Sequence, residues 1–306
     1  MISNPLLTII IAAHNCEKTI EQTFQSLLNA LGSEVIHSEI IIIDDASEDG
    51  TADKVSKLAQ IYPQVIVSKV NYKNIGQVRQ HGISLSHGEY ITMLDSDDLL
   101  KNETLSSIMS FLNSERPDMF LTRLHEIRDL NKIDHYWSGL NPEKISRCET
   151  IRRFLIHKDL QAHLIGQFIK RKIYLQHSIP SMTCYEDFYV FPSMIMKAES
   201  IYYQYDSHYY YIKNQGSLSS ALNPEKIKNL IDCTLKMESV FPTKFKSLIL
   251  CHWLDIFIKH GSLIKNERDK LTVQKHIKQT FSPLFFFNPN VRLSYKRKAL
   301  SILWKK

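Results

Sequence analysis

The sequence has few residues of the kinds that mark zinc-binding or disulfide-rich proteins. Its 306 residues contain five cysteines, which form no CxxC pair and have no histidine at the spacing of a metal site. The pattern therefore gives no indication of a disulfide framework or a structural zinc site. Unpaired cysteines suit a reducing compartment, so we expect the protein to lie in the cytoplasm.

Long hydrophobic runs are also missing. The first apolar run, Leu6 to Ala13, is far shorter than the ~20 residues that a membrane span needs, and it lacks a basic leader. We interpret this run as a core strand. The sequence has neither an internal repeat nor a low-complexity linker, which favours parts that pack together over parts that swing freely.

Acidic residues are absent from the end of the chain. From Lys270 onward there are nine Lys and Arg and no Asp or Glu, which leaves −3 of the total net charge of +6 for residues 1–269. The tail also contains three consecutive phenylalanines, and basic residues beside large apolar ones suit anionic lipid headgroups. A nucleic-acid patch is the competing interpretation, but no nucleic-acid-binding motif accompanies the charge. We expect peripheral attachment to the inner face of the cell membrane.

The first half of the chain alternates short β-branched runs with amphipathic segments. Strands are expected at residues 6–11, 39–43, 65–68 and 90–94, and helices at 18–31, 51–60 and 77–85. The continuous run "EIIII" implies burial on both faces, as in a parallel sheet covered by helices. This order predicts an α/β fold with a doubly wound, mostly parallel sheet flanked by helices.

The second half is less regular. The pattern favours helices at 102–113 and 149–156, strands at 119–123, 164–170 and the tyrosine-rich run "IYYQYDSHYYYIKN", and a loop at 129–146. From Pro224 onward the pattern is helical. We therefore expect a C-terminal helical extension that ends in the basic, aromatic tail.

Polar residues gather at the ends of three expected strands. The clusters are "AAHN" (12–15), "DDASEDGT" (44–51) and "DSDD" (95–98). Ligands of such sheets bind beyond the carboxyl ends of the strands, and carboxylates suit Mg²⁺ or Mn²⁺, which neutralise a diphosphate. Asp97 or Asp98 could instead cap a following helix, but capping does not explain three carboxylates at one strand end.

Five motifs occur in a fixed order between about residues 6 and 219: "LTIIIAAHN", "EIIIIDDASEDGT", "NIG" with "RQHG", "HGEYITMLDSDDLL" and "YEDFYVFPSMIMKA". Together they resemble the successive motifs of family 2 glycosyltransferases of the bacterial surface polysaccharide type. The resemblance implies the GT-A fold and a nucleotide-sugar donor. It also suggests a GT-A domain at 1–220, with a nucleotide-sugar half at about 1–100 and an acceptor half at about 101–220, followed by the helical region at 221–306.

The resemblance implies which residues meet the donor. The first two clusters would hold the nucleoside, through Ala12, His14, Asp44 and Asp45. Here His14 stands where the family usually has a tyrosine. Arg79 matches the arginine that faces the donor.

The third cluster matches the paired aspartates of the family. Asp95 and Ser96 would lie on the ribose side of the donor, and Asp97 would ligate Mn²⁺ or Mg²⁺ on the diphosphate. Many relatives place a histidine after the tyrosine strand, near the metal. Asn214 occupies that region here and could ligate through its amide oxygen, with Lys213 as another contact to phosphate.

The general base of the family is the Asp of an "ED" pair, which here is Asp187 after Glu186. Inverting transfer needs a carboxylate near the acceptor hydroxyl, on the face of the sugar opposite the leaving diphosphate. We expect both acids in the catalytic site, with Asp187 as the base. By themselves, the two could simply be first-turn acids that complement a helix dipole.

The expected function is therefore inverting, metal-dependent transfer of a sugar from a nucleoside diphosphate, with UDP as the expected nucleotide, to a saccharide or lipid-linked acceptor. Two rivals stay open. A sugar nucleotidyltransferase would need a glycine-rich loop after the first strand, where "AAHNCEKT" has no glycine. A catalytically silent nucleotide-sugar-binding or scaffold protein would be expected to lose its acids, which are all present.

Overall fold

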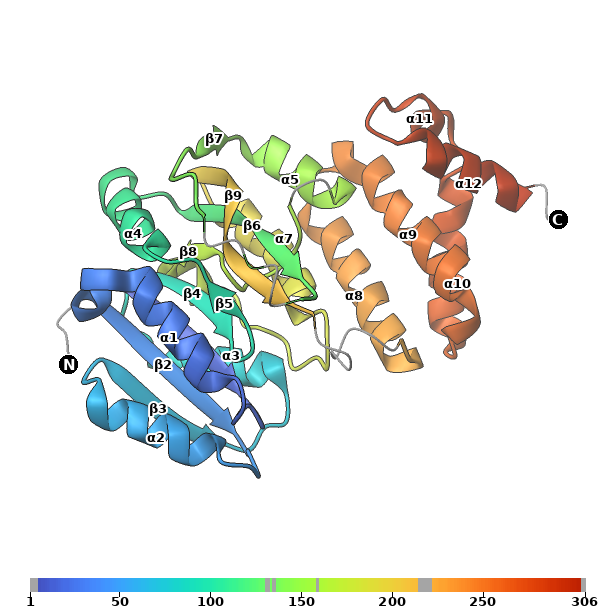
Figure 1. Ribbon diagram of the computed structural model, residues 1–306. Helices are drawn as coiled ribbons and strands as arrows, with labels where there is room; N and C mark the ends of the chain where they lie inside the picture. Colours follow the sequence, from blue (N-terminus) through green and yellow to red (C-terminus); the bar gives the residue numbers. More distant parts are fainter. Residues whose placement is uncertain (1–4, 130–132, 134–135, 158–159, 214–221, 304–306) are drawn as a thin grey trace.

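One twisted sheet runs through the computed structural model of the protein, which describes residues 5–129, 133, 136–157, 160–213 and 222–303 (Figure 1). Within these residues the sheet has nine strands, and eight of them lie in the order β3-β2-β1-β4-β8-β6-β9-β5, with β7 pairing to β9. The strands are β1 (Leu7–Ala13), β2 (Ser38–Asp45), β3 (Val65–Val70), β4 (Tyr90–Asp95), β5 (Leu99–Leu100), β6 (Met119–Ile127), β7 (Glu143–Ile145), β8 (Phe168–Lys170) and β9 (Ile201–Ile212).

Helices flank the sheet and continue beyond it. The helices of the sheet region are α1 (Ile20–Leu31), α2 (Thr51–Ile61), α3 (Ile75–Leu85), α4 (Thr104–Glu115), α5 (Arg147–Ile156), α6 (Arg171–Tyr174) and α7 (Glu186–Lys197). The later helices are α8 (Pro224–Val240), α9 (Lys246–His260), α10 (Glu267–Gln279), α11 (Pro283–Phe287) and α12 (Leu293–Leu303).

Strands β3, β2, β1 and β4 are parallel neighbours. The isoleucine run of β2 is buried on both faces of this sheet. Ile41 and Ile43 cluster with Val78 of α3, whereas Ile40 and Ile42 belong to the main core with Phe24 of α1. Both faces of the strand are thus covered by helices, which is the environment that a continuous apolar run requires. The prediction of a doubly wound, mostly parallel sheet is confirmed.

The second half of the sheet contains the elements that the sequence pattern missed. Strand β7 lies inside the stretch expected to be a loop, and the two-residue β5 precedes the expected helix. Of the strand expected at 164–170, only the last three residues form a strand, β8. Gly166 has a φ of +66°, and a Cβ built on it would lie 3.0 Å from the Tyr209 ring, so the chain turns there instead of extending.

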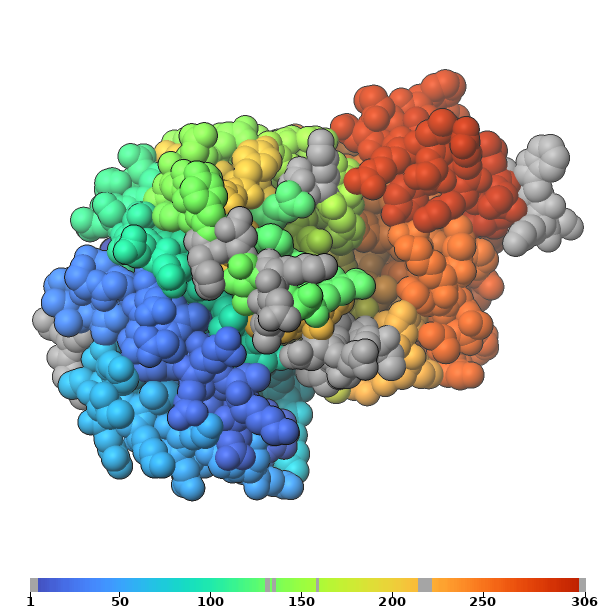
Figure 2. Space-filling model, viewed as in Figure 1, coloured from blue at the N-terminus to red at the C-terminus, as the bar shows by residue number. Residues whose placement is uncertain are grey.

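The C-terminal helices form a lobe beside the sheet, coloured orange to red in Figures 1 and 2. Aromatic side chains pack between this lobe and the sheet region. The ring centroids of Phe154 in α5 and of Phe241, which follows α8, lie 5.9 Å apart. A polar cluster connects the lobe internally. Glu238 accepts hydrogen bonds from Trp253 and His276, each over 2.9 Å.

The predicted division of the chain near residue 220 falls within 214–221, outside the described residues, and stays a prediction. Among the helices that the structure describes, none combines the length and the apolar character that crossing a bilayer requires.

Candidate functional site

The parallel register brings the three polar clusters to one edge of the sheet. Ala13 of β1 pairs with Asp44 of β2, and Ala12 pairs with Asp95 of β4. The carboxyl ends of β1, β2 and β4 therefore lie side by side. In a sheet of this kind, that edge is where ligands bind.

At this edge, Asp45 holds the turn between β3 and α3. Its buried carboxylate accepts hydrogen bonds from the backbone N–H groups of Tyr72 (2.6 Å), Lys73 (3.0 Å) and Asn74 (3.2 Å). The carbonyl oxygen of Asp45 lies 2.6 Å from Nδ1 of His14, whose side chain is exposed. The predicted nucleoside residues His14 and Asp45 are thus adjacent.

Two further predicted donor residues make local contacts. The buried carboxylate of Asp44 accepts a hydrogen bond from the Ser47 N–H over 3.3 Å. The carbonyl of Ser96 accepts hydrogen bonds from the hydroxyl of Thr19, the residue before α1, over 2.8 Å and from the hydroxyl of Thr23 of α1 over 3.0 Å. These contacts fix the loops around the edge.

Arg79 of α3 lies at the centre of the acidic groups. Its guanidinium donates to Glu186 over 2.5 Å and to Asp95 over 3.2 Å, and only 6% of the residue is exposed. Burial alone would lower the pKa of Arg79, but the carboxylates of Asp95 and Glu186 raise it, so the charge is held. Arg79 thereby joins the end of β4 to the start of α7.

Glu186 faces inward, toward this arginine. Only 5% of the residue is exposed. Burial and the neighbouring charge of Asp187 raise the pKa of Glu186 to about 7, although Arg79 acts in the opposite direction. The geometry gives Glu186 a positioning role, since its carboxylate is engaged by Arg79.

Asp98 does not cap a helix, because β5 intervenes and the N-cap residue of α4 is Glu103. Its buried carboxylate accepts hydrogen bonds from the Tyr209 hydroxyl (2.6 Å) and the Ile212 N–H (2.7 Å), which ties the end of β4 to β9. Burial and the nearby Asp95 raise the pKa of Asp98 to about 8. Asp98 is therefore turned away from the edge, unlike the partly exposed Asp95 and Asp97.

The predicted metal ligands can be compared with what a hard cation needs. Within the described part of the chain, no three His, Cys, Asp or Glu side chains are gathered to hold a metal ion. Mg²⁺, however, is usually bound by one or two carboxylates together with substrate phosphates and water. The carboxylate oxygens of Asp97 are of the type that suits such an ion, and its role as a ligand stays a prediction. Asn214 lies outside the described residues, and Lys213 pairs with Glu126 over 3.0 Å.

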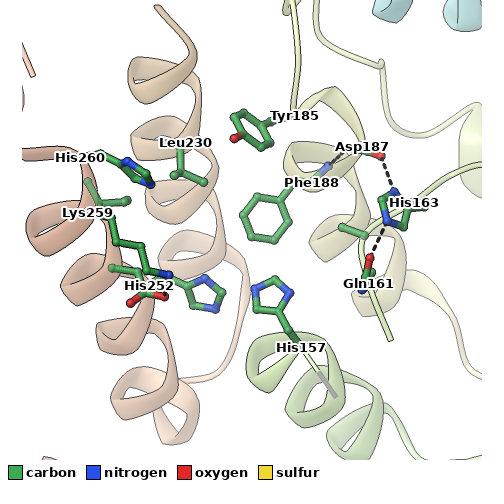
Figure 3. Close-up of a pocket in the computed structure, with 13 residues that line it drawn as sticks. His157, Gln161, His163, Tyr185, Asp187, Phe188, Leu230, His252, Lys259 and His260 are labelled. Atoms are coloured by element: carbon green, nitrogen blue, oxygen red, sulfur yellow. Dashed lines mark hydrogen bonds and ion pairs between the residues drawn. The ribbon is translucent and has the colours of Figure 1, made fainter. Parts of the chain in front are cut away.

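Asp187 opens onto a cavity of about 310 Å³, shown in Figure 3. Its carboxylate lies 3.7 Å from Nδ1 of His163, and the other ring nitrogen of His163 lies 2.8 Å from Gln161. The sequence analysis missed His163, because no spacing signal links this histidine to an acid on a later helix. The carboxylate of Asp187 and the imidazole of His163 are thus neighbours at the cavity wall, and the carboxylate accepts a hydrogen bond from the Phe188 N–H over 2.7 Å.

The cavity is enclosed by separate parts of the chain. Its lining residues come from α7 and its approach, the end of α5, residues 161–163, α8 and α9: His157, Gln161, Ala162, His163, Tyr185, Asp187, Phe188, Leu230, His252, Asp255, Ile256, Lys259 and His260. The sequence predictions named one of these, Asp187. Tyr185 and Phe188 belong to the "YEDF" motif but were given no role, and the others carry no motif and meet through the packing of the C-terminal lobe on the sheet region.

Solved structures with a similar fold are bacterial and archaeal glycosyltransferases. S. aureus TarS (residues 1–349), in complex with UDP-GlcNAc, matches 98% of this chain and 92% of its own, with a TM-score of 0.71 and 17% identity. The mannosyltransferase PcManGT from Pyrobaculum calidifontis, in complex with GDP-Man and Mn²⁺, has a TM-score of 0.58 at 13% identity, over 99% and 88% of the two chains. The expected GT-A fold is confirmed.

Similar sequences are also glycosyltransferases. The Escherichia coli UDP-Glc:alpha-D-GlcNAc-diphosphoundecaprenol beta-1,3-glucosyltransferase WfaP is 37% identical over 112 residues, which are 36% of this chain and 43% of WfaP. The poly(ribitol-phosphate) beta-glucosyltransferase of Bacillus spizizenii is 30% identical over 45% of this chain and 22% of its own length. The chain thus spans less than half of either relative.

A longer alignment joins the chain to the cholesterol galactosyltransferase of Borreliella burgdorferi, at 22% identity over 91% of this chain and 82% of that protein. The model of the family described as "Glycosyl transferase family 2" matches residues 8–174, more than half of the chain and including every strand end described above. The chain therefore belongs to glycosyl transferase family 2.

Proposed function

We propose that the protein is an inverting, metal-dependent glycosyltransferase that moves a sugar from a nucleoside diphosphate sugar, with UDP as the expected nucleotide, to a hydroxyl of a saccharide or lipid-linked acceptor. One observation carries the proposal. A line of contacts from Asp95 through Arg79 to Glu186 joins the sheet edge to the first turn of α7, where Asp187 opens onto a cavity. A donor site and an acceptor site would thus be adjacent.

The donor would lie along the carboxyl edge of the parallel strands. His14 and Asp45 would meet the nucleoside, and Asp95 the ribose side, while Asp97 would hold the cation. A bound Mn²⁺ or Mg²⁺ would supply positive charge to the diphosphate as it leaves. The complexes of TarS with UDP-GlcNAc and of PcManGT with GDP-Man and Mn²⁺ support this type of donor and cation.

Asp187 would act as the base. Its carboxylate would accept the proton of the acceptor hydroxyl while that oxygen forms a bond to the anomeric carbon and the bond to the diphosphate breaks. The Phe188 N–H, which donates to the carboxylate over 2.7 Å, would orient it, and His163 lies beside it at 3.7 Å. Glu186 and Arg79 would keep the first turn of α7 in place, since both are buried and joined to each other.

We also propose that the acceptor belongs to cell-surface polysaccharide synthesis and that the enzyme binds the anionic inner face of the membrane. The relatives named for poly(ribitol-phosphate) and diphosphoundecaprenol substrates support the first part. The tail supports the second part. Leu284 and Phe287 of α11 are 81% and 85% exposed, and one face of α12 exposes Leu293, Arg297 and Leu300.

The test is a thermal-shift screen of UDP-, GDP-, dTDP- and CMP-sugars and of the nucleoside triphosphates, with and without Mn²⁺, because a ligand of the folded state raises its stability. One UDP-sugar should raise the melting temperature, and only with the metal. Release of UDP from that donor should then be measurable. Stabilisation without turnover, in the presence of a broad set of acceptors, would favour a silent binding protein, and stabilisation by a nucleoside triphosphate would favour a nucleotidyltransferase.

A further inference from the structure

The cavity beside Asp187 is lined by rings on its inner side. In Figure 3, His157, Phe188 and His252 point toward one another, and their centroids lie 5.1 to 5.9 Å apart. His157 ends α5, Phe188 belongs to α7 and His252 belongs to α9. The volume of about 310 Å³ is at the lower end of ligand pockets, roughly 300–1,000 Å³.

The hydrogen bond of His252 fixes which of its nitrogens is available. Nε2 lies 3.1 Å from the carbonyl oxygen of Leu155, which can only accept, so Nε2 carries the hydrogen. Burial lowers the pKa of His252 to about 3, and the neighbouring His157 acts in the same direction. The ring is therefore neutral, and Nδ1 presents a lone pair that can accept a hydrogen bond from a hydroxyl.

The charges around the cavity do not favour a phosphate group. Lys259 pairs with Asp255 over 3.0 Å, and Asp255 also pairs with Lys298 over 2.7 Å. Burial lowers the pKa of His157 as well, so this ring is neutral at ordinary pH. Asp187 adds a negative charge that would repel an anion. The lining instead combines ring faces with neutral polar groups, which suits a sugar ring with its hydroxyls.

We propose that this cavity is the subsite for the acceptor sugar, that it takes a neutral, polyhydroxylated ring, and that Nδ1 of His252 accepts a hydrogen bond from one of its hydroxyls. The inference rests on the proposed function, because Asp187 is the base only if the protein transfers sugars. It goes further by placing acceptor recognition on α9, which lies outside the part of the chain that matches the family model, residues 8–174.

The test uses His252→Gln, because the amide nitrogen of Gln can still donate to the Leu155 carbonyl while the acceptor at the Nδ1 position is lost. The probes are methyl glycosides of glucose, N-acetylglucosamine and galactose, with glucose 1-phosphate as the charged counterpart. Each is added to the complex with UDP and diamagnetic Mg²⁺, and binding is followed by NMR of the histidine ring nitrogens. His37→Gln, at an exposed histidine of the 3-10 helix η1 (Gly32–His37), is the matched control.

At least one methyl glycoside should shift the ring signals of His157 and His252, and His252→Gln should weaken its binding about five- to tenfold, the effect of one lost neutral hydrogen bond. The control should bind like the wild type. The inference is overturned if the signals move only with glucose 1-phosphate, if no glycoside moves them, or if His252→Gln binds the glycoside unchanged.

Hydrolysis of the nucleotide-sugar by water separates this inference from the proposed function. If the wild-type protein neither binds nor hydrolyses any nucleotide-sugar, the proposed function fails and the acceptor subsite fails with it. If hydrolysis is normal but the glycosides do not bind at the cavity, only the subsite is wrong.

Discussion

Arg79 and Glu186 form a buried ion pair of 2.5 Å although they are 107 positions apart in the sequence. The same guanidinium reaches Asp95 over 3.2 Å. One side chain therefore connects a helix of the parallel half, the end of β4 and the first turn of α7. Glu186 thus fixes the position of Asp187, its neighbour on the same turn.

Arg79→Met should destabilise the fold by about 3–5 kcal/mol, because removing one partner of a buried pair leaves the other charge uncompensated. Urea unfolding followed by circular dichroism measures the loss. Arg79→Met/Glu186→Leu should recover part of it, since neither charge then stays buried alone. Arg128→Met, at an exposed arginine, serves as the control and should change stability by less than ~0.5 kcal/mol. Glu186→Leu is measured alone as well, and a loss in the double variant equal to the sum of the two single losses would show that the pair is not coupled.

Asp187→Asn should lower kcat by roughly 10²- to 10⁴-fold, the usual contribution of a general base. The stabilisation by the donor should change little, because Asp187 faces the cavity and not the sheet edge. Steady-state release of UDP and a donor thermal shift measure the two effects separately. Asp232→Asn, at a surface acid paired with Lys228, is the control. A kcat within twofold of the wild type would remove Asp187 as the base.

Asp97→Asn should raise the Mn²⁺ concentration for half-maximal turnover at least tenfold, the change that ~1.4 kcal/mol of lost ligation produces. Asp98→Asn is the informative comparison. Its carboxylate ties β4 to β9 through Tyr209 and Ile212, so this variant should lose thermal stability while its metal dependence stays normal. An unchanged Mn²⁺ dependence in Asp97→Asn would refute the ligand assignment.

The contact between Glu238 and His276 should make the stability of the C-terminal lobe depend on pH. Burial alone would lower the pKa of His276, but the hydrogen bond to Glu238 raises it above 6.5. Burial alone would raise the pKa of Glu238, but hydrogen bonds from His276 and Trp253 lower it below 4.5. The contribution of His276 to the free energy of unfolding is present below about pH 6.5 and is lost as the pH rises through its raised pKa. The contribution of Glu238 is present above about pH 4.5 and is lost as the pH falls through its lowered pKa.

The contact should therefore contribute most between about pH 4.5 and 6.5. The rings of His276 and Trp253 stack with their centroids 4.3 Å apart, and His276→Phe keeps a ring at this position. The variant should lower the free energy of unfolding by about 1.5–3 kcal/mol near pH 5.5. Chemical unfolding at several pH values should show the difference from the wild type shrinking toward pH 9. A difference that does not vary with pH would mean that the charge of the pair contributes nothing.

The double variant Leu284→Ser/Phe287→Ser should bind vesicles that contain phosphatidylglycerol at least roughly tenfold more weakly, because burying each side chain in lipid is worth about 1.5–3 kcal/mol. Substitution is preferable to truncation, since Phe285 and Ala299 are fully buried and a deletion would open the core. Ile36→Ser, at an exposed isoleucine far along the chain, is the control. Wild-type binding by the double variant would exclude α11 as the membrane contact.

The parallel half of the fold was predictable because its signals are local. Each strand is a short apolar run, and each run is followed by a helix with one apolar face, so the sequence pattern contains the order of elements. Strands β5 and β7 are short and hold together through pairing with β9, which no local pattern reports. Pro192 lies inside α7, although a proline usually begins or interrupts a helix, because the surrounding residues are buried in the core.

The candidate site divides in the same way. Residues at strand ends, such as Asp45 and Asp95, follow from register, since parallel strands place their carboxyl ends together. The cavity neighbours of Asp187 do not, because His163 and His252 border the same cavity through the packing of residues 161–163 and α9 against α7. Asp98 shows a second limit of local patterns. It belongs to the same acidic run as Asp97, yet its side chain is turned into the core, and only the contacts of β9 explain that direction.

One wall of the cavity comes from α7 and the opposite wall from α9, and this shared construction has an evolutionary consequence under the proposed function. Substitutions in α9 would change which hydroxyl compound is glycosylated, while the strand ends that hold the activated sugar stay as they are. Diversification of surface polysaccharides would then proceed by substitutions at the cavity-lining positions of one helix of the C-terminal lobe. Exchanging residues 246–260 between relatives would be a direct way to redirect product formation in the laboratory.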